Sequence, residues 1–224
     1  MSRKVIGIPG YKSEEKFGAG INHLQFLDTF GNVRIIMPWE ERVDVDLLYL
    51  PGGLDAAPVN YNEVPSFRTS NTDVFKEHFL TQRLANYVEA GTPIFGVCLG
   101  FQQLAVHFGC KLTQNLLWHE QSGGRWQTAH KVHPTQEVIR THKGFKPFEV
   151  NSHHHQALTE RNVSDQIVPL LTAGNNDNYI TKEGEIIEAF AVKGKRIFGV
   201  QWHPEELYDN YSMSVIKTLL KEVI

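Results

Sequence analysis

Three short stretches of the sequence hold residue types that could carry out nucleophilic chemistry, and the first is centred on Cys98. This cysteine lies between Gly96 and Gly100, after a short apolar run and before a run with helical spacing. A cysteine on a strand-to-helix turn has the geometry of a nucleophile elbow, and the helix N-terminus behind the sulfur favours the thiolate. The alternative is a buried core cysteine between two turn glycines. The stretch predicts a cysteine nucleophile.

The second stretch, His203-Pro204-Glu205, follows the last apolar run of the chain. On an extended segment, side chains two residues apart point the same way, and Pro204 would restrict the backbone between them. A carboxylate beside an imidazole selects its tautomer and stabilises the imidazolium. Taken alone, this could be a chance motif in a loop. Together with Cys98 it predicts a general base, His203, and the residue that orients it, Glu205.

The third stretch is Pro51-Gly52-Gly53, after another apolar run. Glycines here let backbone N–H groups approach a ligand closely, so Gly52 or Gly53 could donate to an oxyanion. The N–H of Leu99, the residue after the nucleophile, would be the second donor. An ordinary strand-to-loop turn is the alternative. The three stretches together predict an acyl-transfer site.

The surrounding pattern predicts an α/β fold that would bring these stretches together. Apolar runs alternate with helical spacing in the first half, which favours parallel strands with helices on both faces. Strands are expected at residues 5–8, 33–37, 47–50 and 94–97, and helices at 21–27, 74–90, 99–108 and 212–223. The runs at 168–173, 185–192 and 196–200 predict antiparallel strands, and residues 111–145 an irregular β segment covering one sheet edge.

Length and composition narrow the function classes. The 224 residues predict a single catalytic domain, 1–224, and the net charge of −3 without basic clusters argues against nucleic-acid binding. No run approaches the ~18 apolar residues of a membrane span. Two cysteines cannot form a disulfide framework, so a reducing, cytoplasmic setting is expected.

The histidines do not indicate a metal site by their spacing. His119, His130, His133 and His142 are scattered through the irregular segment. Residues 153–155 are three successive histidines, but neighbours on an extended chain face opposite sides and cannot easily bind one ion together. We therefore expect no metal, and a loop that presents one or two of these histidines to a pocket.

These motifs resemble those of the class I (triad) glutamine amidotransferases and the related γ-glutamyl hydrolases. Residues 96–102 resemble the family's elbow, 199–205 its C-terminal triad motif, 51–53 its oxyanion loop and 150–154 its substrate-carboxylate segment. The resemblance implies a three-layer, flavodoxin-like fold with an open, mostly parallel sheet and a small antiparallel extension. It implies no cofactor and a γ-glutamyl amide as substrate, cleaved through a thioester. The implied site residues are Cys98, His203 and Glu205 for the triad, Gly53, Leu99 and Gly52 for the oxyanion, and Gln102, Ser152 and His153 for the substrate.

The resemblance leaves the branch of the family open. The elbow sequence, with Leu99 and Gln102, is similar to that of glutaminase components, which pass ammonia to a separate synthetase subunit. The pattern from Gly52 to Tyr61 is similar instead to freestanding hydrolases of the γ-glutamyl-γ-aminobutyrate type. A binding module on an inactive hydrolase fold is a third hypothesis, disfavoured because all three triad positions hold competent residues.

Overall fold

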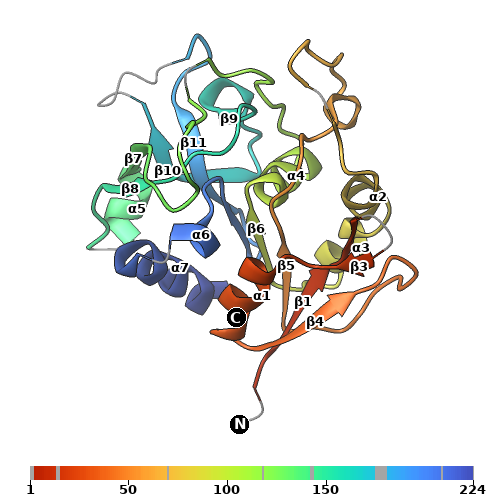
Figure 1. The fold of residues 1–224 in the computed structure, drawn as a ribbon. Helices are drawn as coiled ribbons and strands as arrows, with labels where there is room; N and C mark the ends of the chain where they lie inside the picture. Colours follow the sequence, from red (N-terminus) through yellow and green to blue (C-terminus); the bar gives the residue numbers. More distant parts are fainter. Residues whose placement is uncertain are drawn as a thin grey trace.

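One mixed sheet runs through the molecule in the computed structural model (Figure 1). The structure describes residues 3–13, 16–69, 71–117, 119–141, 144–174, 181–207 and 209–223. The strand order is β4-β1-β5-β6-β12-β11-β10-β7-β8. The bounds are Val5–Pro9 for β1, Asn32–Ile36 for β4, Leu47–Leu50 for β5, Ile94–Val97 for β6, His130–Pro134 for β7, Phe148–Val150 for β8, Ile167–Ala173 for β10, Ile186–Val192 for β11 and Ile197–Val200 for β12.

The sheet has a parallel half and an antiparallel half. Strands β4, β1, β5, β6 and β12 pair in parallel. From β12 onward the pairs β12–β11, β11–β10, β10–β7 and β7–β8 are antiparallel. The short β9 (Leu158–Thr159) pairs with β11, and β2 (Tyr11–Ser13) and β3 (Lys16–Gly18) form a separate hairpin. The expected open α/β sheet, with parallel strands and an antiparallel extension, is confirmed.

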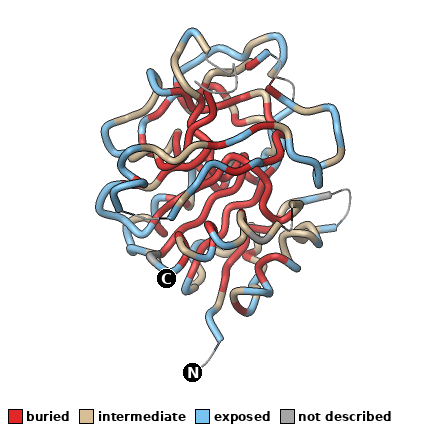
Figure 2. The backbone as a smooth tube through the Cα atoms, turned by 90° about the vertical axis from the view of Figure 1, so that its left-hand side faces the viewer, coloured by how far each residue is buried: buried red, intermediate tan, exposed pale blue. Residues whose placement is uncertain are grey.

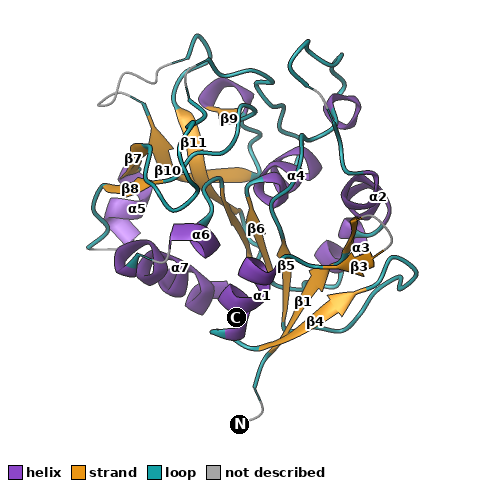
Figure 3. Cartoon of the chain, viewed as in Figure 1, coloured by secondary structure: helices purple, strands orange, loops and turns teal. Residues whose placement is uncertain are grey.

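Helices cover both faces of this sheet (Figures 1 and 3). One layer comprises α1 (Ile21–Asp28), α6 (Pro204–Leu207) and α7 (Asn210–Val223), and the other α2 (Val74–Gln82), α3 (Leu84–Glu89) and α4 (Leu99–His107). Successive residues of a strand pack against opposite helical layers, because their side chains point alternately to the two faces of the sheet. Tyr49 packs with the first layer and Leu48 and Leu50 with the second. The buried residues accordingly concentrate along the central strands (Figure 2).

The structure corrects three local predictions. The expected helix 74–90 is broken at Arg83, where φ is −131°. The Thr81 hydroxyl donates to the Glu77 carbonyl at 3.0 Å, a back-bond that often bends helices. The segment 111–145 contains a helix, α5 (Gln136–Thr141), as well as β7 at the sheet edge.

The third correction concerns the segment after β12, which is helical rather than extended at Glu205. Pro204 begins α6, as its fixed φ suits the first helical position. The Glu206 N–H donates to the His203 carbonyl at 3.2 Å. Glu205 therefore contacts His203 from the first turn of α6, so the predicted contact exists but the extended backbone predicted for it is wrong. None of the helices in the described ranges is both long and apolar enough to cross a membrane.

Candidate active site

Cys98 occupies a strained turn that only small neighbours permit. It follows β6, which is paired on both sides, and its own N–H donates to the Val200 carbonyl at 2.9 Å. Its φ is +50° and its ψ −105°, a conformation that costs a non-glycine residue free energy. A Cβ on Gly100 would lie 2.2 Å from the Leu50 carbonyl oxygen, and one on Gly96 2.6 Å from the Gly100 oxygen. The glycines thus allow the elbow to pack against the sheet.

His203 and Glu205 lie directly beside this cysteine. His203 Nδ1 is 2.7 Å from Glu205 Oε1. The ring also lies near Cys98, since a Cβ on Gly52 would be 2.7 Å from His203 Cε1 and 3.4 Å from Cys98 Cβ. Burial lowers the pKa of His203, but the negative charges of Cys98 and Glu205 outweigh it and raise this pKa to about 10. Burial also opposes ionisation of Glu205, yet His203 holds the carboxyl pKa below its ordinary value. The arrangement favours an imidazolium at His203, between the Cys98 side chain and a carboxylate.

Asn151 fixes the backbone of the imidazole-bearing residue. The His203 N–H donates to Asn151 Oδ1 at 2.8 Å, and Asn151 Nδ2 donates to the His203 carbonyl at 3.1 Å. Asn151 is fully buried, so both bonds form away from water. The resemblance named this segment only for substrate contact, and the positioning role of Asn151 was missed.

A second histidine lies behind Glu205. His23 Nδ1 is 3.5 Å from Glu205 Oε1 and 2.8 Å from the Tyr49 hydroxyl. Burial lowers the pKa of His23, although Glu205 opposes this. Because the lowered pKa favours a neutral His23, the negative charge of the Glu205 carboxylate is balanced by His203 and not by His23. The helix α1 that carries His23 was predicted, but its contact with the site was not.

Lys76 fixes the orientation of the predicted oxyanion loop. Its ammonium, in a residue only 7% exposed, donates to the Gly52 carbonyl and lies 4.6 Å from the ring centre of Tyr11. In a trans peptide the N–H points opposite to the carbonyl, so the Gly53 N–H is directed away from Lys76. A Cβ on Gly52 would meet His203 at 2.7 Å, and one on Gly53 would meet Leu99 at 2.6 Å. Gly52, Gly53, Leu99 and the triad positions are therefore neighbours.

A pocket of about 260 Å³ opens at the cysteine. Gly53, Cys98, Gln102 and His153 line it, so four of the predicted site residues share this space. The Gln102 amide donates to the Gln156 carbonyl at 2.8 Å and to Gln201 Oε1 at 3.2 Å, which holds the side chain in the wall. Ser152 is not among the lining residues.

Ser152 is instead attached to the neighbouring loop. Its N–H donates to Gln121 Oε1 at 2.7 Å, and its carbonyl accepts from the Gln121 N–H at 2.9 Å. Its hydroxyl is buried and has no hydrogen-bond partner among the described residues. A direct substrate contact by Ser152 therefore stays a prediction, and the structure brings it to the site less closely than His153.

The three successive histidines all line the pocket, but their side chains contact different partners, as the alternation of side chains along an extended segment predicts. The His153 ring lies 6.3 Å from the His203 ring, and His155 Nε2 is 3.0 Å from Asp55 Oδ1. His154 turns into the protein toward Glu188 of β11, its Nε2 3.8 Å from Glu188 Oε1. Burial lowers the pKa of His154 to about 3 even though Glu188 raises it.

Two further histidines contact the same carboxylate. His119 Nε2 lies 3.2 Å and His130 Nε2 3.3 Å from Glu188 Oε1. Burial alone would raise the pKa of Glu188, but His130, His119 and His154 together hold it well below its ordinary value. This cluster was missed because its members are far apart in sequence. His142, also considered, lies outside the described residues.

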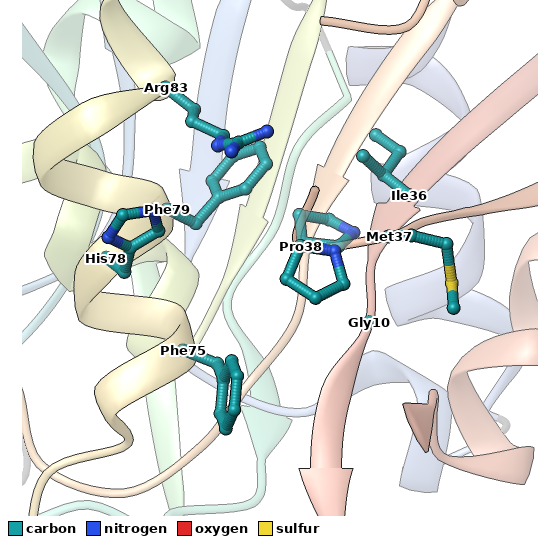
Figure 4. Close-up of a pocket in the computed structure, with 9 residues that line it drawn as sticks. Gly10, Ile36, Met37, Pro38, Phe75, His78, Phe79 and Arg83 are labelled. Carbon is teal, nitrogen blue, oxygen red and sulfur yellow. The ribbon is translucent and has the colours of Figure 1, made fainter. Parts of the chain in front are cut away.

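A separate hollow lies between the ends of β1 and β4 and the helix α2 (Figure 4). Phe75 and Phe79 of α2 lie on one side of it and Pro38 on the other. Its volume is about 10 Å³, room for roughly one water molecule. Neither Cys98 nor His203 lines it, so it is no candidate for the active site.

Comparison with known proteins places this geometry in a class. Residues 33–205 match the peptidase C26 family. The chain is 33% identical over 201 residues to the candidate glutamine amidotransferase-like protein YvdE of Lactococcus lactis, covering 80% of this chain and 78% of that protein. It is 34% identical over 182 residues to the protein NtpR of Enterococcus hirae, and the match covers 75% of this chain and 70% of NtpR.

Solved structures agree on the fold. A candidate GMP synthase subunit from Thermoplasma acidophilum superposes with a TM-score of 0.66 over 99% of this chain and 94% of its own, at 18% identity. A glutamine amidotransferase from Thermotoga maritima superposes with a TM-score of 0.59, at 15% identity, over 100% of this chain and 85% of its own. The chain thus has the class I glutamine amidotransferase fold. Because the family match spans residues 33–205, the chain belongs to the peptidase C26 / class I glutamine amidotransferase-like family.

Proposed function

We propose that the chain hydrolyses a γ-glutamyl amide through a thioester on Cys98. The observation that carries this proposal is the contact of Cys98, at the strained N-terminus of α4, with His203, which Glu205 holds at 2.7 Å. A nucleophile, a base and an orienting carboxylate in hydrogen-bonding sequence make up the machinery of acyl transfer. The same contacts disfavour an inactive binding module.

In the first half-reaction the Cys98 sulfur attacks the γ-carbonyl carbon, and the carbonyl oxygen becomes an oxyanion that the N–H groups of Leu99 and Gly53 receive. His203 holds the proton taken from the thiol and gives it to the leaving nitrogen as the carbon–nitrogen bond breaks. In the second half-reaction His203 takes a proton from water, the hydroxyl oxygen bonds to the acyl carbon, and the carbon–sulfur bond breaks. Glutamate and the amine or ammonia are the products.

We infer that glutamine is the substrate and that the ammonia serves a separate synthetase subunit. The pocket at Cys98, about 260 Å³, is below the roughly 300–1,000 Å³ typical of sites for drug-sized ligands, which supports a small amide. The elbow sequence with Leu99 and Gln102 supports the same branch. The alternative is a freestanding hydrolase of longer γ-glutamyl-amines, supported by the match to peptidase C26 and by the loop from Gly52 to Tyr61.

A substrate panel tests the proposal. Release of ammonia or amine is measured from glutamine and from several γ-glutamyl-amines, with and without candidate synthetases, and with Cys98→Ala as the control. We expect glutamine turnover that rises when the cognate synthetase is added. Efficient cleavage of γ-glutamyl-amines with glutamine ignored would establish the alternative branch. Both the glutaminase and the hydrolase proposals would be contradicted if the protein cleaved none of these substrates and if no glutamine-derived electrophile labelled Cys98.

A further inference from the structure

A buried cluster of histidines and one carboxylate lies beside the proposed active site and takes no part in its chemistry. Its members are His119, His130, His154 and Glu188, none more than 6% exposed. One side-chain atom from each of His119, His154 and Glu188 falls within 4.8 Å of the others. A buried carboxylate is costly unless hydrogen bonds or a cation compensate its charge.

Hydrogen bonding does not account for His154. Its Nδ1 lies 3.1 Å from the Gln156 carbonyl oxygen, and because a carbonyl can only accept, Nδ1 must carry the proton. In the neutral ring Nε2 then holds a lone pair, and Nε2 lies 3.8 Å from the Glu188 oxygen. Two acceptors face each other inside the protein. Nε2 of His154 and Oε2 of Glu188 have no hydrogen-bond partner among the residues that the structure describes.

The spacing of the cluster suits a bound ion. A tetrahedral zinc site with metal–ligand distances of about 2.0–2.1 Å has ligand–ligand edges of roughly 3.3–3.4 Å. His119 Nε2 lies 3.2 Å from Glu188 Oε1, in a hydrogen bond whose proton must leave Nε2 when a metal binds, and His154 Nε2 lies 3.8 Å from the same oxygen. The two edges that meet at Glu188 are thus near those of a tetrahedral site, and all three ligand atoms lie within 4.8 Å of one another. Two imidazoles and one carboxylate also match the donor types that Zn²⁺ prefers.

The contacts around these three residues are of the kind that hold metal ligands in place. Histidines that bind metals donate their other ring N–H to a carbonyl or carboxylate, and ligating carboxylates are themselves hydrogen-bonded. His154 has such a bond to Gln156, and His130 lies 3.3 Å from Glu188 Oε1. His119 also lines a cavity of about 370 Å³, which provides an entry path. We propose that His119, His154 and Glu188 bind one Zn²⁺ ion, with His130 orienting Glu188.

The ion would join two parts of the molecule. Glu188 belongs to β11 of the main sheet, His119 to the loop before β7, and His154 to the segment that lines the Cys98 pocket. Binding would therefore fix the pocket wall to the sheet from behind. This site is independent of the proposed reaction, so either can fail without the other.

Metal binding by Cys98 must be excluded first, because a thiolate beside an imidazole can itself bind zinc. The full chain carrying Cys98→Ala is therefore stripped with a chelator and titrated with Zn²⁺, and then with Co²⁺ as a spectroscopic probe. We expect one ion per chain, a Co²⁺ absorption band without a sulfur-to-metal transition, and a higher melting temperature with Zn²⁺. A Cys98→Ala chain that binds neither ion would overturn the proposal.

Variants in the same background assign the ligands. Glu188→Gln and His119→Gln should each weaken Zn²⁺ binding by more than about 100-fold, since removing an outer-shell partner already costs about 10–100-fold. His130→Gln should fall within that outer-shell range. His133→Gln, on the same strand as His130, is the matched control and should bind as tightly as the parent. Equal Zn²⁺ affinity in Glu188→Gln, His119→Gln and the parent would contradict the assignment.

Discussion

Replacing Lys76 by methionine should slow acylation while the nucleophile, its base and the glycines of the oxyanion loop keep their identities. The Lys76 ammonium donates to the Gly52 carbonyl, 24 positions away, and sets which way the Gly52–Gly53 peptide points. Lys76→Met retains the length of the side chain and its helix propensity but removes the charge and the donor. The Gly53 N–H is then no longer held toward the developing oxyanion.

The magnitude follows from the bond that is lost. A hydrogen bond to a charged group contributes about 1.5–3 kcal/mol, and about 1.4 kcal/mol corresponds to a tenfold rate change. We therefore expect kcat to fall roughly 10- to 150-fold. Outright loss of an oxyanion donor costs about 10²–10³ in kcat, which sets the upper limit. KM should change little, because the oxyanion exists only in the transition state and intermediates.

Steady-state kinetics on the best substrate of the panel, with electrophile labelling of Cys98 to count active sites, measures this effect. Lys217→Met, an exposed lysine on α7, is the matched control and should retain the kinetics of the parent. A folded Lys76→Met protein with unchanged kcat, or one whose whole defect lies in KM, would refute the orienting role.

Four further predictions concern the triad and its support. Because Cys98 is one cause of the raised pKa of His203, Cys98→Ala should lower that pKa from about 10, as measured by NMR of the imidazole nitrogens. In the unsubstituted protein, kcat/KM should decline as the pH rises through about 10, since deprotonated His203 cannot protonate the leaving nitrogen. Glu205→Gln should reduce kcat less than His203→Ala, because the carboxylate orients the base without transferring the proton; equal losses would argue against this division. Asn151→Ala removes both hydrogen bonds to the His203 backbone and should cost about 1–3 kcal/mol of unfolding free energy, measured by urea denaturation.

The sequence was most informative where chemistry and backbone geometry are local. The elbow could be predicted because Gly96 and Gly100 flank Cys98, and the structure shows that a Cβ at either position would collide with backbone. The pairing of His203 with Glu205 was also predictable, since the two residues are separated by a single position. The extended backbone predicted between them was wrong, because Pro204 starts a helix there.

Contacts between distant segments depend on tertiary packing and could not be predicted. Lys76 meets Gly52 across 24 positions, Asn151 meets His203 across 52, and His119 meets Glu188 across 69. No periodicity or motif encodes such pairs, because the sheet order that joins them arises from the packing of the whole chain. The fold class, the proposed nucleophile and its base could be inferred from local patterns alone. The orientation of the oxyanion loop, and the meeting of three histidines at one buried carboxylate, required the folded chain.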